Sequence, residues 1–418
     1  MNETSDEEPT ISGKLKHRNK LHFAQDRYYW LFGKTLKISS TSSLKDATKE
    51  IRIEKSTVIN LIDKGKYFEM TIETEKGPYV LMGSRNDVVP CFCALSNCKN
   101  LGLSMEDFEI ICVLGKGFFG KVLKVRKKDN NTLYAIKTIR KKKLIEENSV
   151  STITAERSLT LIQNNPFIIK LCFAFQNPHK FYLGMEYAEG GELLHYLRQF
   201  PIIPIDDTRL YIAEIICALE HLHKNNVIYR DLKPSNILLD NSGHIKITDF
   251  GLSKNVSDSD GLAATFCGTF EYMAPEIIQH LEYDYKVDIW SLGVVFYEIL
   301  NGETPFYAEN QEELFNNIIN KEVKFSKFMH RQASNLIKKF LNKNPANRPT
   351  FEEIKADPFF SKLKWDDVLA KKNQPAHLNE NCFGADDDEY EPPVDSLVTS
   401  RDISNNNLEI PGFSFGFT

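Results

Sequence analysis

Short runs in which apolar and polar residues alternate fill roughly the first hundred residues of the chain. Seven such runs predict strands at residues 12–16, 28–32, 35–39, 50–53, 57–62, 67–74 and 79–82. Turn residues at 32–34, 63–66 and 76–78 separate several of these runs, and a mixed apolar stretch at 87–98 predicts a closing helix. This order of elements is typical of a small antiparallel barrel or sandwich.

The pattern changes after a short linker at about residues 97–104. Glycine-punctuated strand patterns surround residues 114–122 and 134–137, and a further buried strand is expected at 181–188. A helix is expected at 151–162, and a strand–turn–strand pattern covers 237–247. An apolar helix begins at Asp288 and opens a largely helical region. We therefore expect a multidomain α+β protein.

Composition narrows the class of protein. The chain has 418 residues, of which 42% are hydrophobic and 26% charged, and its net charge of −5 gives no reason to expect nucleic acid as a partner. No apolar run reaches the roughly 18–20 residues that a membrane span needs. The acidic, polar start does not resemble a signal peptide, and the eight cysteines lack zinc-finger spacing. These features favour a cytoplasmic protein with reduced thiols.

The strongest chemical signal lies in residues 227–251. Asp231 is followed by Lys233 and Asn236, and a predicted hairpin then leads to Asp249. Phosphoryl transfer requires a carboxylate beside the substrate hydroxyl, oxygen ligands for Mg²⁺ and a cation near the moving phosphoryl group. The four side chains supply these groups, and the hairpin would hold the two metal ligands in a defined relation.

This segment resembles the H-R-D-L-x-x-x-N and D-F-G motifs of eukaryotic protein kinases, with Tyr229 in place of His. That exchange is usual in the AGC group. Further motifs follow the family order: G-x-G-x-x-G-x-V at 115–122, Y-A-I-K at 134–137, T-F-C-G-T-F-E-Y-M-A-P-E at 265–276 and N-R-P at 347–349. The resemblance implies a bilobal kinase domain at 108–360 and a C-terminal AGC extension at 361–418. The overall layout is most similar to the protein kinase B (Akt) family.

The resemblance implies ATP and Mg²⁺ as cofactors. It assigns catalytic roles to Asp231, Lys233, Lys137 and Glu156, and metal binding to Asn236 and Asp249. The implied nucleotide-binding residues are Leu114, Gly115, Lys116, Gly117, Phe118, Phe119, Gly120, Val122, Ala135, Lys137, Met185, Glu186, Ala188 and Glu192. A pseudokinase scaffold is the alternative, but it is disfavoured because every catalytic position is filled.

The same resemblance implies a switch and a substrate class. Phosphorylation by an upstream kinase is expected at Thr265 in the activation segment and at Ser414, within a terminal stretch that resembles a hydrophobic motif. Lys233 is typical of Ser/Thr kinases, and Glu192 and Glu298 are the expected acidic substrate-binding residues. We expect a monomer that prefers proteins with Arg three residues before the target.

Residues 8–101 resemble a pleckstrin-homology (PH) domain, with strands at 12–16 and 27–31 as its first pair. Lipid-binding members clamp inositol phosphates with basic residues, for which Lys16, Arg18 and Arg27 are the candidates. The stretch that precedes Arg27 lacks one basic residue of the lipid-binding pattern. Two roles therefore stay open for this domain: recruitment to phosphoinositides of the plasma membrane, or docking and autoinhibition without lipid.

Overall fold

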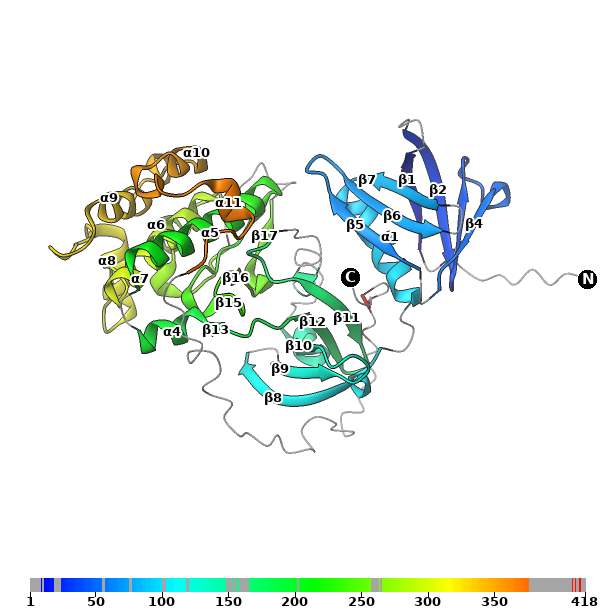
Figure 1. Cartoon of the computed structure of the whole chain (residues 1–418), viewed down its shortest axis with the longest axis horizontal. Coiled ribbons are helices and arrows are strands. Elements are labelled where there is room, and N and C mark those ends of the chain that lie inside the picture. Colours follow the sequence, from blue (N-terminus) through cyan, green and yellow to red (C-terminus); the bar gives the residue numbers. More distant parts are fainter. Residues whose placement is uncertain are drawn as a thin grey trace, which may run out of the picture. The chain divides into compact units, whose positions relative to one another are not determined.

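The computed structural model describes residues 9, 11–18, 24–54, 57–74, 77–99, 103–117, 120–147, 153, 156–157, 165–200, 203–256, 263, 265–375, 408, 410 and 413–414. Phe118 and Phe119, and most of the expected extension after residue 375, lie outside the described residues. The chain forms two compact units (Figure 1). The first comprises Met1–Asn164, Lys170–Tyr187 and Asp387–Thr418, and the second Asn165–Ile169 and Ala188–Asp386.

The first unit begins with an antiparallel seven-stranded sheet in the order β4-β3-β2-β1-β7-β6-β5. Its strands are β1 (Ile11–Arg18), β2 (Ala24–Phe32), β3 (Thr35–Ser39), β4 (Lys49–Arg52), β5 (Ile59–Asp63), β6 (Phe68–Thr74) and β7 (Gly77–Gly83). Helix α1 (Arg85–Lys99) follows and contacts β1, β6 and β7. Leu15, Leu81 and Phe92 are among the side chains buried between sheet and helix. The seven strands and the helix predicted from the sequence are all present.

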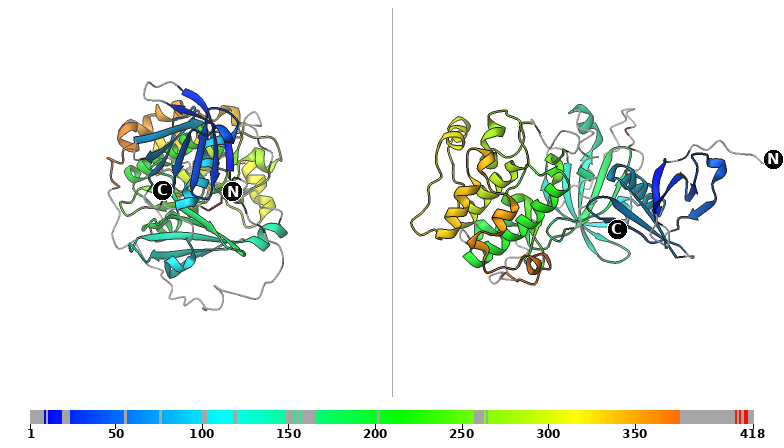
Figure 2. Two further views of the ribbon diagram at one scale, coloured as in Figure 1. Left: turned by 90° about the vertical axis from the view of Figure 1, so that its right-hand side faces the viewer. Right: turned by 90° about the horizontal axis from the view of Figure 1, so that it is seen from above.

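A second antiparallel sheet in the first unit has the order β11-β12-β10-β9-β8 (Figure 1). Figure 2 shows the chain from two further sides. Its strands are β8 (Phe108–Lys116), β9 (Gly120–Lys127), β10 (Leu133–Arg140), β11 (Leu171–Gln176) and β12 (Lys180–Glu186), and α2 (Lys141–Glu146) follows β10. Rings of Phe108, Phe173 and Phe175 stack on one face of the sheet. Ile139, Phe181 and Leu183 belong to a second apolar cluster.

The second unit is mainly helical. Its helices are α4 (Leu193–Gln199), α5 (Ile205–Lys224), α6 (Pro275–Ile278), α7 (Lys286–Asn301), α8 (Gln311–Asn320), α9 (Arg331–Phe340), α10 (Phe351–Lys355) and α11 (Trp365–Leu369). Its short strands are β13 (Gly191–Glu192), β14 (Val227–Ile228), β15 (Ile237–Leu239), β16 (Ile245–Ile247) and β17 (Lys254–Asn255). Helices α5 and α7 contact each other and are buried along most of their length, as expected of helices that are apolar on several sides.

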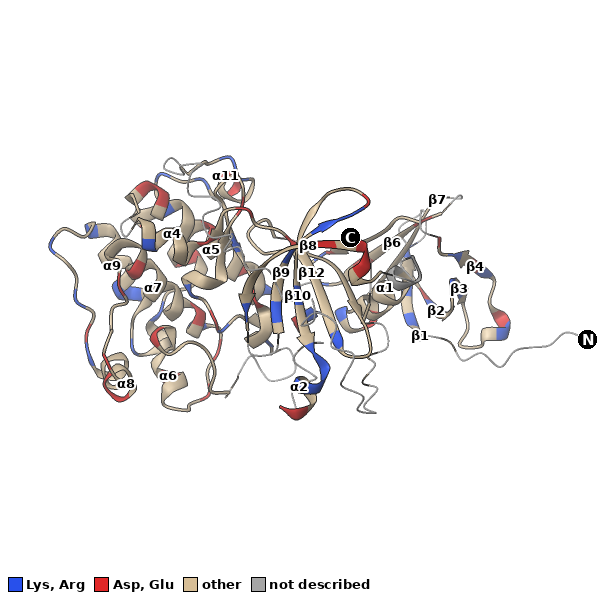
Figure 3. Cartoon of the chain, turned by 90° about the horizontal axis from the view of Figure 1, so that it is seen from below, with Lys and Arg blue, Asp and Glu red and all other residues tan. Residues whose placement is uncertain are grey.

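Charged side chains of both signs are distributed along both units (Figure 3). Lys141 at the start of α2 is only 4% exposed, and its ammonium group donates a hydrogen bond to Gln176 Oε1 (3.0 Å). Among the helices of the described residues, none combines the length and the apolar character that a bilayer crossing would demand.

Candidate active site

The carboxylate of Asp231 is the centre of a hydrogen-bonded cluster in the second unit. Asp231 is 8% exposed and lies between β14 and η3 (Pro234–Asn236). It accepts hydrogen bonds from Asn236 Nδ2 (2.7 Å) and from Thr269 Oγ1 (3.2 Å), and Lys233 Nζ lies 3.0 Å from Oδ2. This network fixes the orientation of the carboxylate, which keeps a small exposed area.

Lys233 and Thr269 join the loop to the segment that follows it. Lys233 Nζ donates to Thr269 Oγ1 (2.8 Å), and the same hydroxyl donates to Asp231. The three side chains therefore form a closed triangle. A carboxylate beside a primary ammonium group can orient an incoming hydroxyl, accept its proton and offset negative charge on a transferred group.

The hairpin of β15 and β16 brings Asn236 and the Asp249 region together. Ile237 pairs with Ile247, and the backbone N–H of Thr248 donates to the Asn236 carbonyl (3.0 Å). Asp249 follows directly with a left-handed backbone (φ 56°). Asn236 uses its amide nitrogen on Asp231, which leaves its side-chain oxygen available as a ligand. One amide oxygen and one carboxylate fit Mg²⁺, which takes few protein ligands when phosphates supply the rest.

Asp288 at the start of α7 holds the backbone just before Asp231 in place. Its side chain is fully buried and accepts from the backbone N–H groups of Tyr229 (2.9 Å) and Arg230 (2.8 Å). His223 Nε2 lies 2.7 Å from the same carboxylate. Arg230 has φ 69°, a left-handed conformation that costs energy for a non-glycine residue. The two backbone hydrogen bonds stabilise that conformation.

Tyr229 occupies the motif position where His is usual, and the structure shows what it does. Its side chain is fully buried, its hydroxyl donates to the Thr248 carbonyl, and its ring meets Phe250 edge-on at 5.4 Å. Burial raises the pKa of the hydroxyl, and the negative charges of Asp231 and Asp249 add to that effect. The phenol therefore stays a hydrogen-bond donor.

Arg230 links the catalytic loop to the backbone at Thr265. Its Nε donates to the Leu252 carbonyl (2.6 Å), and its terminal nitrogen donates to the Tyr283 hydroxyl (3.1 Å). That hydroxyl donates to the Thr265 carbonyl (2.7 Å), and the Thr265 side chain is exposed. No local sequence signal pointed to Tyr283, because it lies 18 residues beyond Thr265 in a segment without a motif.

Most of the predicted nucleotide residues lie in the first unit. Lys137 on β10 pairs with the buried Glu156, with Nζ and Oε1 2.7 Å apart. Gly120 tolerates no side chain, because an added Cβ would lie 1.6 Å from the Thr138 carbonyl oxygen. Leu114, Gly115, Lys116, Gly117 and Val122 lie on or between β8 and β9, Ala135 pairs with Met185, and Glu186 ends β12. Ala188 and Glu192 belong to the second unit.

The two predicted acidic substrate residues differ in their surroundings. Glu298 on α7 accepts from the Tyr272 hydroxyl (2.7 Å), and burial raises the pKa of its carboxyl group. Glu192 lies on β13 opposite Leu238 and is exposed. Both belong to the second unit.

The structure does not bring the three predicted lipid-binding residues together. Lys16 and Arg18 lie on the face of β1 opposite to Leu15, and Arg18 pairs with Glu69 (2.8 Å). Arg27 faces Leu15 across β1 and β2, so it lies on the other face.

On that second face lie His17, a basic residue of the same predicted hairpin, and Lys49, which the sequence analysis missed. His17 stacks on Tyr79 at 4.1 Å, and Lys49 Nζ lies 3.8 Å from the centre of the same ring. Burial lowers the pKa of His17, and the charges of Arg27 and Lys49 lower it further.

The tail residues before Ser414 pack on the five-stranded sheet. Phe413 is 1% exposed and lies 4.5 Å from the ring of Phe181, and Ile410 packs against the same cluster. The Gln176 side chain donates to the Ile410 carbonyl (2.8 Å) and accepts from the Ile410 N–H (3.3 Å). Ser414 is half-buried beside this anchor.

Comparisons with known proteins agree with these features. The protein kinase domain model matches residues 108–360. The chain is 42% identical over 330 residues to the serine/threonine protein kinase ypkA of Aspergillus fumigatus, which covers 76% of this chain and 52% of the relative. It is 41% identical over 309 residues to the serine/threonine-protein kinase YPK1 of Saccharomyces cerevisiae, covering 72% and 45%.

A third relative is covered more fully. The RAC family serine/threonine-protein kinase homolog of Dictyostelium discoideum is 41% identical over 330 residues, which is 77% of this chain and 73% of the relative. The chain spans roughly half the length of the first two relatives.

Proposed function

The chain belongs to the protein kinase family, and from that membership we propose that it phosphorylates proteins with Arg three residues before the target. It is a Ser/Thr protein kinase, as its relatives are. The triangle of Asp231, Lys233 and Thr269 supports phosphoryl transfer, and the exposed carboxylate of Glu192 supports the preference for Arg. Asp231 orients the substrate hydroxyl and accepts its proton, and Lys233 offsets charge on the transferred group.

Protein kinases generally use ATP and Mg²⁺. We assign the nucleotide to the glycine-rich stretch, to Lys137 and to the residues around Met185, and the metal to Asn236 and Asp249. Bound Mg²⁺ neutralises phosphate charge during transfer. The pairing of Lys137 with Glu156 supports this assignment, because it holds the ammonium group in place.

We assign the switch to phosphorylation of Thr265 and Ser414 by an upstream kinase. The Tyr283 hydroxyl connects the backbone of exposed Thr265 to the guanidinium group of Arg230. A phosphate on Thr265 would therefore lie near that guanidinium group and could form a charge-assisted hydrogen bond with it. A phosphate on Ser414 would add charge next to the buried anchor of Phe413.

For the N-terminal domain we propose a PH domain that recruits a cytoplasmic, monomeric kinase to phosphoinositides at the plasma membrane. The supporting feature is the group of His17, Arg27 and Lys49 around Tyr79. Docking to a protein or autoinhibition is the second candidate role, favoured by the pairing of Arg18 with Glu69, which withdraws one expected lipid ligand.

The kinase assignment is tested by ³²P transfer from ATP to a Ser peptide with Arg at the third position before the target. Asp231→Asn should lower the rate by about 10²–10⁴-fold with ATP binding retained, because general-base catalysis contributes that much. Thr265→Ala should reduce transfer after treatment with an activating kinase. Asp367→Asn, on the surface of α11, is the matched control. A wild-type protein phosphorylated at Thr265 that binds ATP without transfer would be a scaffold.

The lipid assignment is tested by cosedimentation with phosphoinositide liposomes. Arg27→Ala should weaken binding, whereas Arg18→Ala should have little effect, because Arg18 lies on the other face and is paired. Binding that neither substitution changes would favour the docking role.

A further inference from the structure

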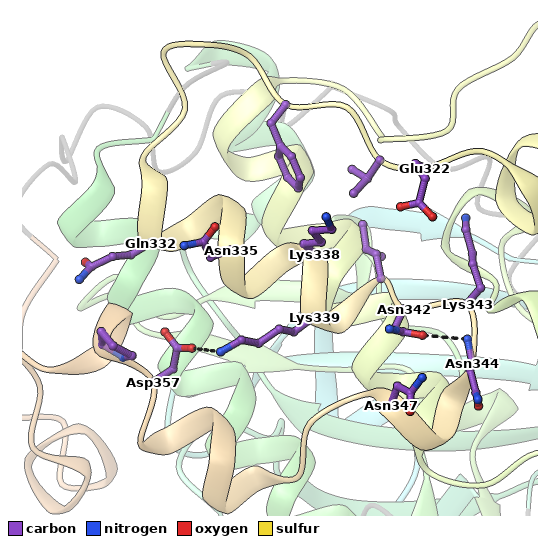
Figure 4. Close-up of a pocket in the computed structure, with 14 residues that line it drawn as sticks. Glu322, Gln332, Asn335, Lys338, Lys339, Asn342, Lys343, Asn344, Asn347 and Asp357 are labelled. Carbon is purple, nitrogen blue, oxygen red and sulfur yellow. Dashed lines mark hydrogen bonds and ion pairs between the residues drawn. The ribbon is translucent and has the colours of Figure 1, made fainter.

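A pocket of about 1120 Å³ lies on the second unit (Figure 4). It is bounded by residues 322–325 after α8, by one side of α9, by residues 341–347 and by the start of η7 (Pro358–Phe360). We call it the α9 pocket. It shares no lining residue with the catalytic loop or the activation segment.

Hydrogen-bonding groups dominate the polar part of the lining. The carboxamides are Gln332, Asn335, Asn342, Asn344 and Asn347, and the lysines are Lys338, Lys339 and Lys343. Within the part of the chain that the structure describes, the side chains of Gln332, Asn335 and Asn347 make no hydrogen bond to protein. Exposed Lys338 likewise has no ion-pair partner there, so these groups remain available to a ligand.

The two carboxylates of the pocket lining already interact with groups of the protein. Asp357 accepts from Lys339 (2.7 Å) and from the backbone N–H of Phe359 (3.0 Å). Glu322 is the second carboxylate, and its charge supports the ammonium group of Lys343. Among the lining lysines that the structure describes, only Lys339 makes an ion pair with a lining carboxylate, and exposed Lys338 makes none.

Lys343 shows that the pocket would favour an added anion. Its ammonium group donates to the Ile318 carbonyl (2.6 Å) and lies 4.1 Å from the centre of the Phe306 ring. Burial lowers the pKa of Lys343 to about 8, although Glu322 raises it. A further negative charge in the pocket would stabilise the protonated amine.

We propose that the α9 pocket binds an extended segment of a protein partner that carries acidic side chains. Carboxamides both donate and accept, which matches the alternating N–H and C=O groups of an extended backbone. Lys338 would pair with a carboxylate, and Phe325 and Leu341 offer apolar contact. The volume exceeds the roughly 300–1,000 Å³ of small-molecule pockets, so a lone phosphate would not fill it. The partner would thus be held at a surface separate from the catalytic loop.

The proposal is tested by fluorescence anisotropy with a labelled peptide of about twelve alternating Glu and Ser residues. Lys338→Glu should raise the Kd about tenfold or more, a change equivalent to at least one lost charge-assisted contact. Lys327→Glu makes the same charge change outside the pocket lining and should alter the Kd much less. Asp231→Asn should bind the peptide like wild type, which separates this site from phosphoryl transfer.

Amine acylation followed by mass spectrometry supplies a measurement on the wild-type protein. The acidic peptide should slow acylation of Lys338 and Lys343 several-fold. Equal weakening by Lys338→Glu and Lys327→Glu, equal binding of a peptide with Gln in place of Glu, displacement by inorganic phosphate at the same potency, or no protection of the two lysines would each overturn the proposal.

Discussion

Replacing Arg348 by Met removes a cation from the interior of the second unit. The guanidinium is fully buried and donates two hydrogen bonds to the Glu276 carboxylate, at 2.6 and 2.8 Å. It also donates to the carbonyls of Lys286 (2.9 Å) and Asn342 (3.0 Å). The substitution therefore leaves a buried carboxylate without its cation and two carbonyls with one donor fewer.

The expected loss in the free energy of unfolding follows from the burial of the Arg348–Glu276 ion pair. Breaking a buried ion pair by removing one partner costs about 3–5 kcal/mol, mainly because the remaining charge stays desolvated. The side chain of Glu276 is only 5% exposed, so water cannot replace the guanidinium without a rearrangement of the backbone. We expect Arg348→Met to lower the free energy of unfolding by that amount.

Urea unfolding of the full chain measures the effect, with Trp290 as a nearby fluorescent reporter at 5.1 Å from the guanidinium. With a slope of about 3 kcal/mol per molar urea, the midpoint should fall by roughly 1 M or more. Arg126→Met is the matched control. Arg126 pairs with Glu109 at 3.0 Å, but both side chains are about half exposed, and such pairs contribute about 0–1 kcal/mol.

Removing both charges provides the decisive comparison. The double variant Arg348→Met with Glu276→Leu should be less destabilised than Arg348→Met alone, because no buried charge is left without a partner. Equal midpoints for Arg348→Met and Arg126→Met, or a double variant less stable than the single one, would refute this reasoning.

Two further predictions concern the tail and a buried lysine. Phe413→Ala should destabilise the anchored tail by about 3–5 kcal/mol, the usual cost of emptying a buried aromatic site, and should speed hydrogen exchange at the backbone of Ile410. Unchanged exchange there would mean that the ring does not hold the tail. Lys343 should acylate faster as pH rises, with half of its maximal rate near pH 8 and a plateau at higher pH, because its pKa is about 8 when folded. Since the unfolded chain then binds more protons between about pH 8 and 10.5, wild type should gain stability over Lys343→Met in that window; a parallel pH dependence of the two proteins would contradict this.

The proximity of the residues around Asp231 could be predicted because these residues are close in sequence. Asp231, Lys233 and Asn236 lie within six residues of one another, and a short hairpin leads to Asp249, so local spacing determines their arrangement. Tyr283 could not be predicted in this way. Its contacts with Arg230 depend on how two distant segments pack, and no periodicity encodes that packing.

The lipid candidates show a second limit. Alternation along β1 predicts that Lys16 and Arg18 share a face, but the face of Arg27 depends on the register between β1 and β2. That register pairs Leu15 with Arg27, and a shift by one residue would have placed Arg27 beside Lys16 instead. Composition cannot determine such a register, and the α9 pocket was missed for a similar reason, since four separate segments build it.

The hydrogen bonds between Gln176 and Ile410 determine which amino-acid substitutions the C-terminal segment can accept. The Gln176 carboxamide donates to the carbonyl of Ile410 and accepts from its N–H, so both hydrogen bonds involve the backbone of Ile410. Substitutions at position 410 by any residue other than Pro therefore leave both hydrogen bonds intact. The backbone attachment therefore does not depend on which side chain stands at position 410, whereas a change of Gln176 would remove both hydrogen bonds and leave the tail held by the burial of Phe413.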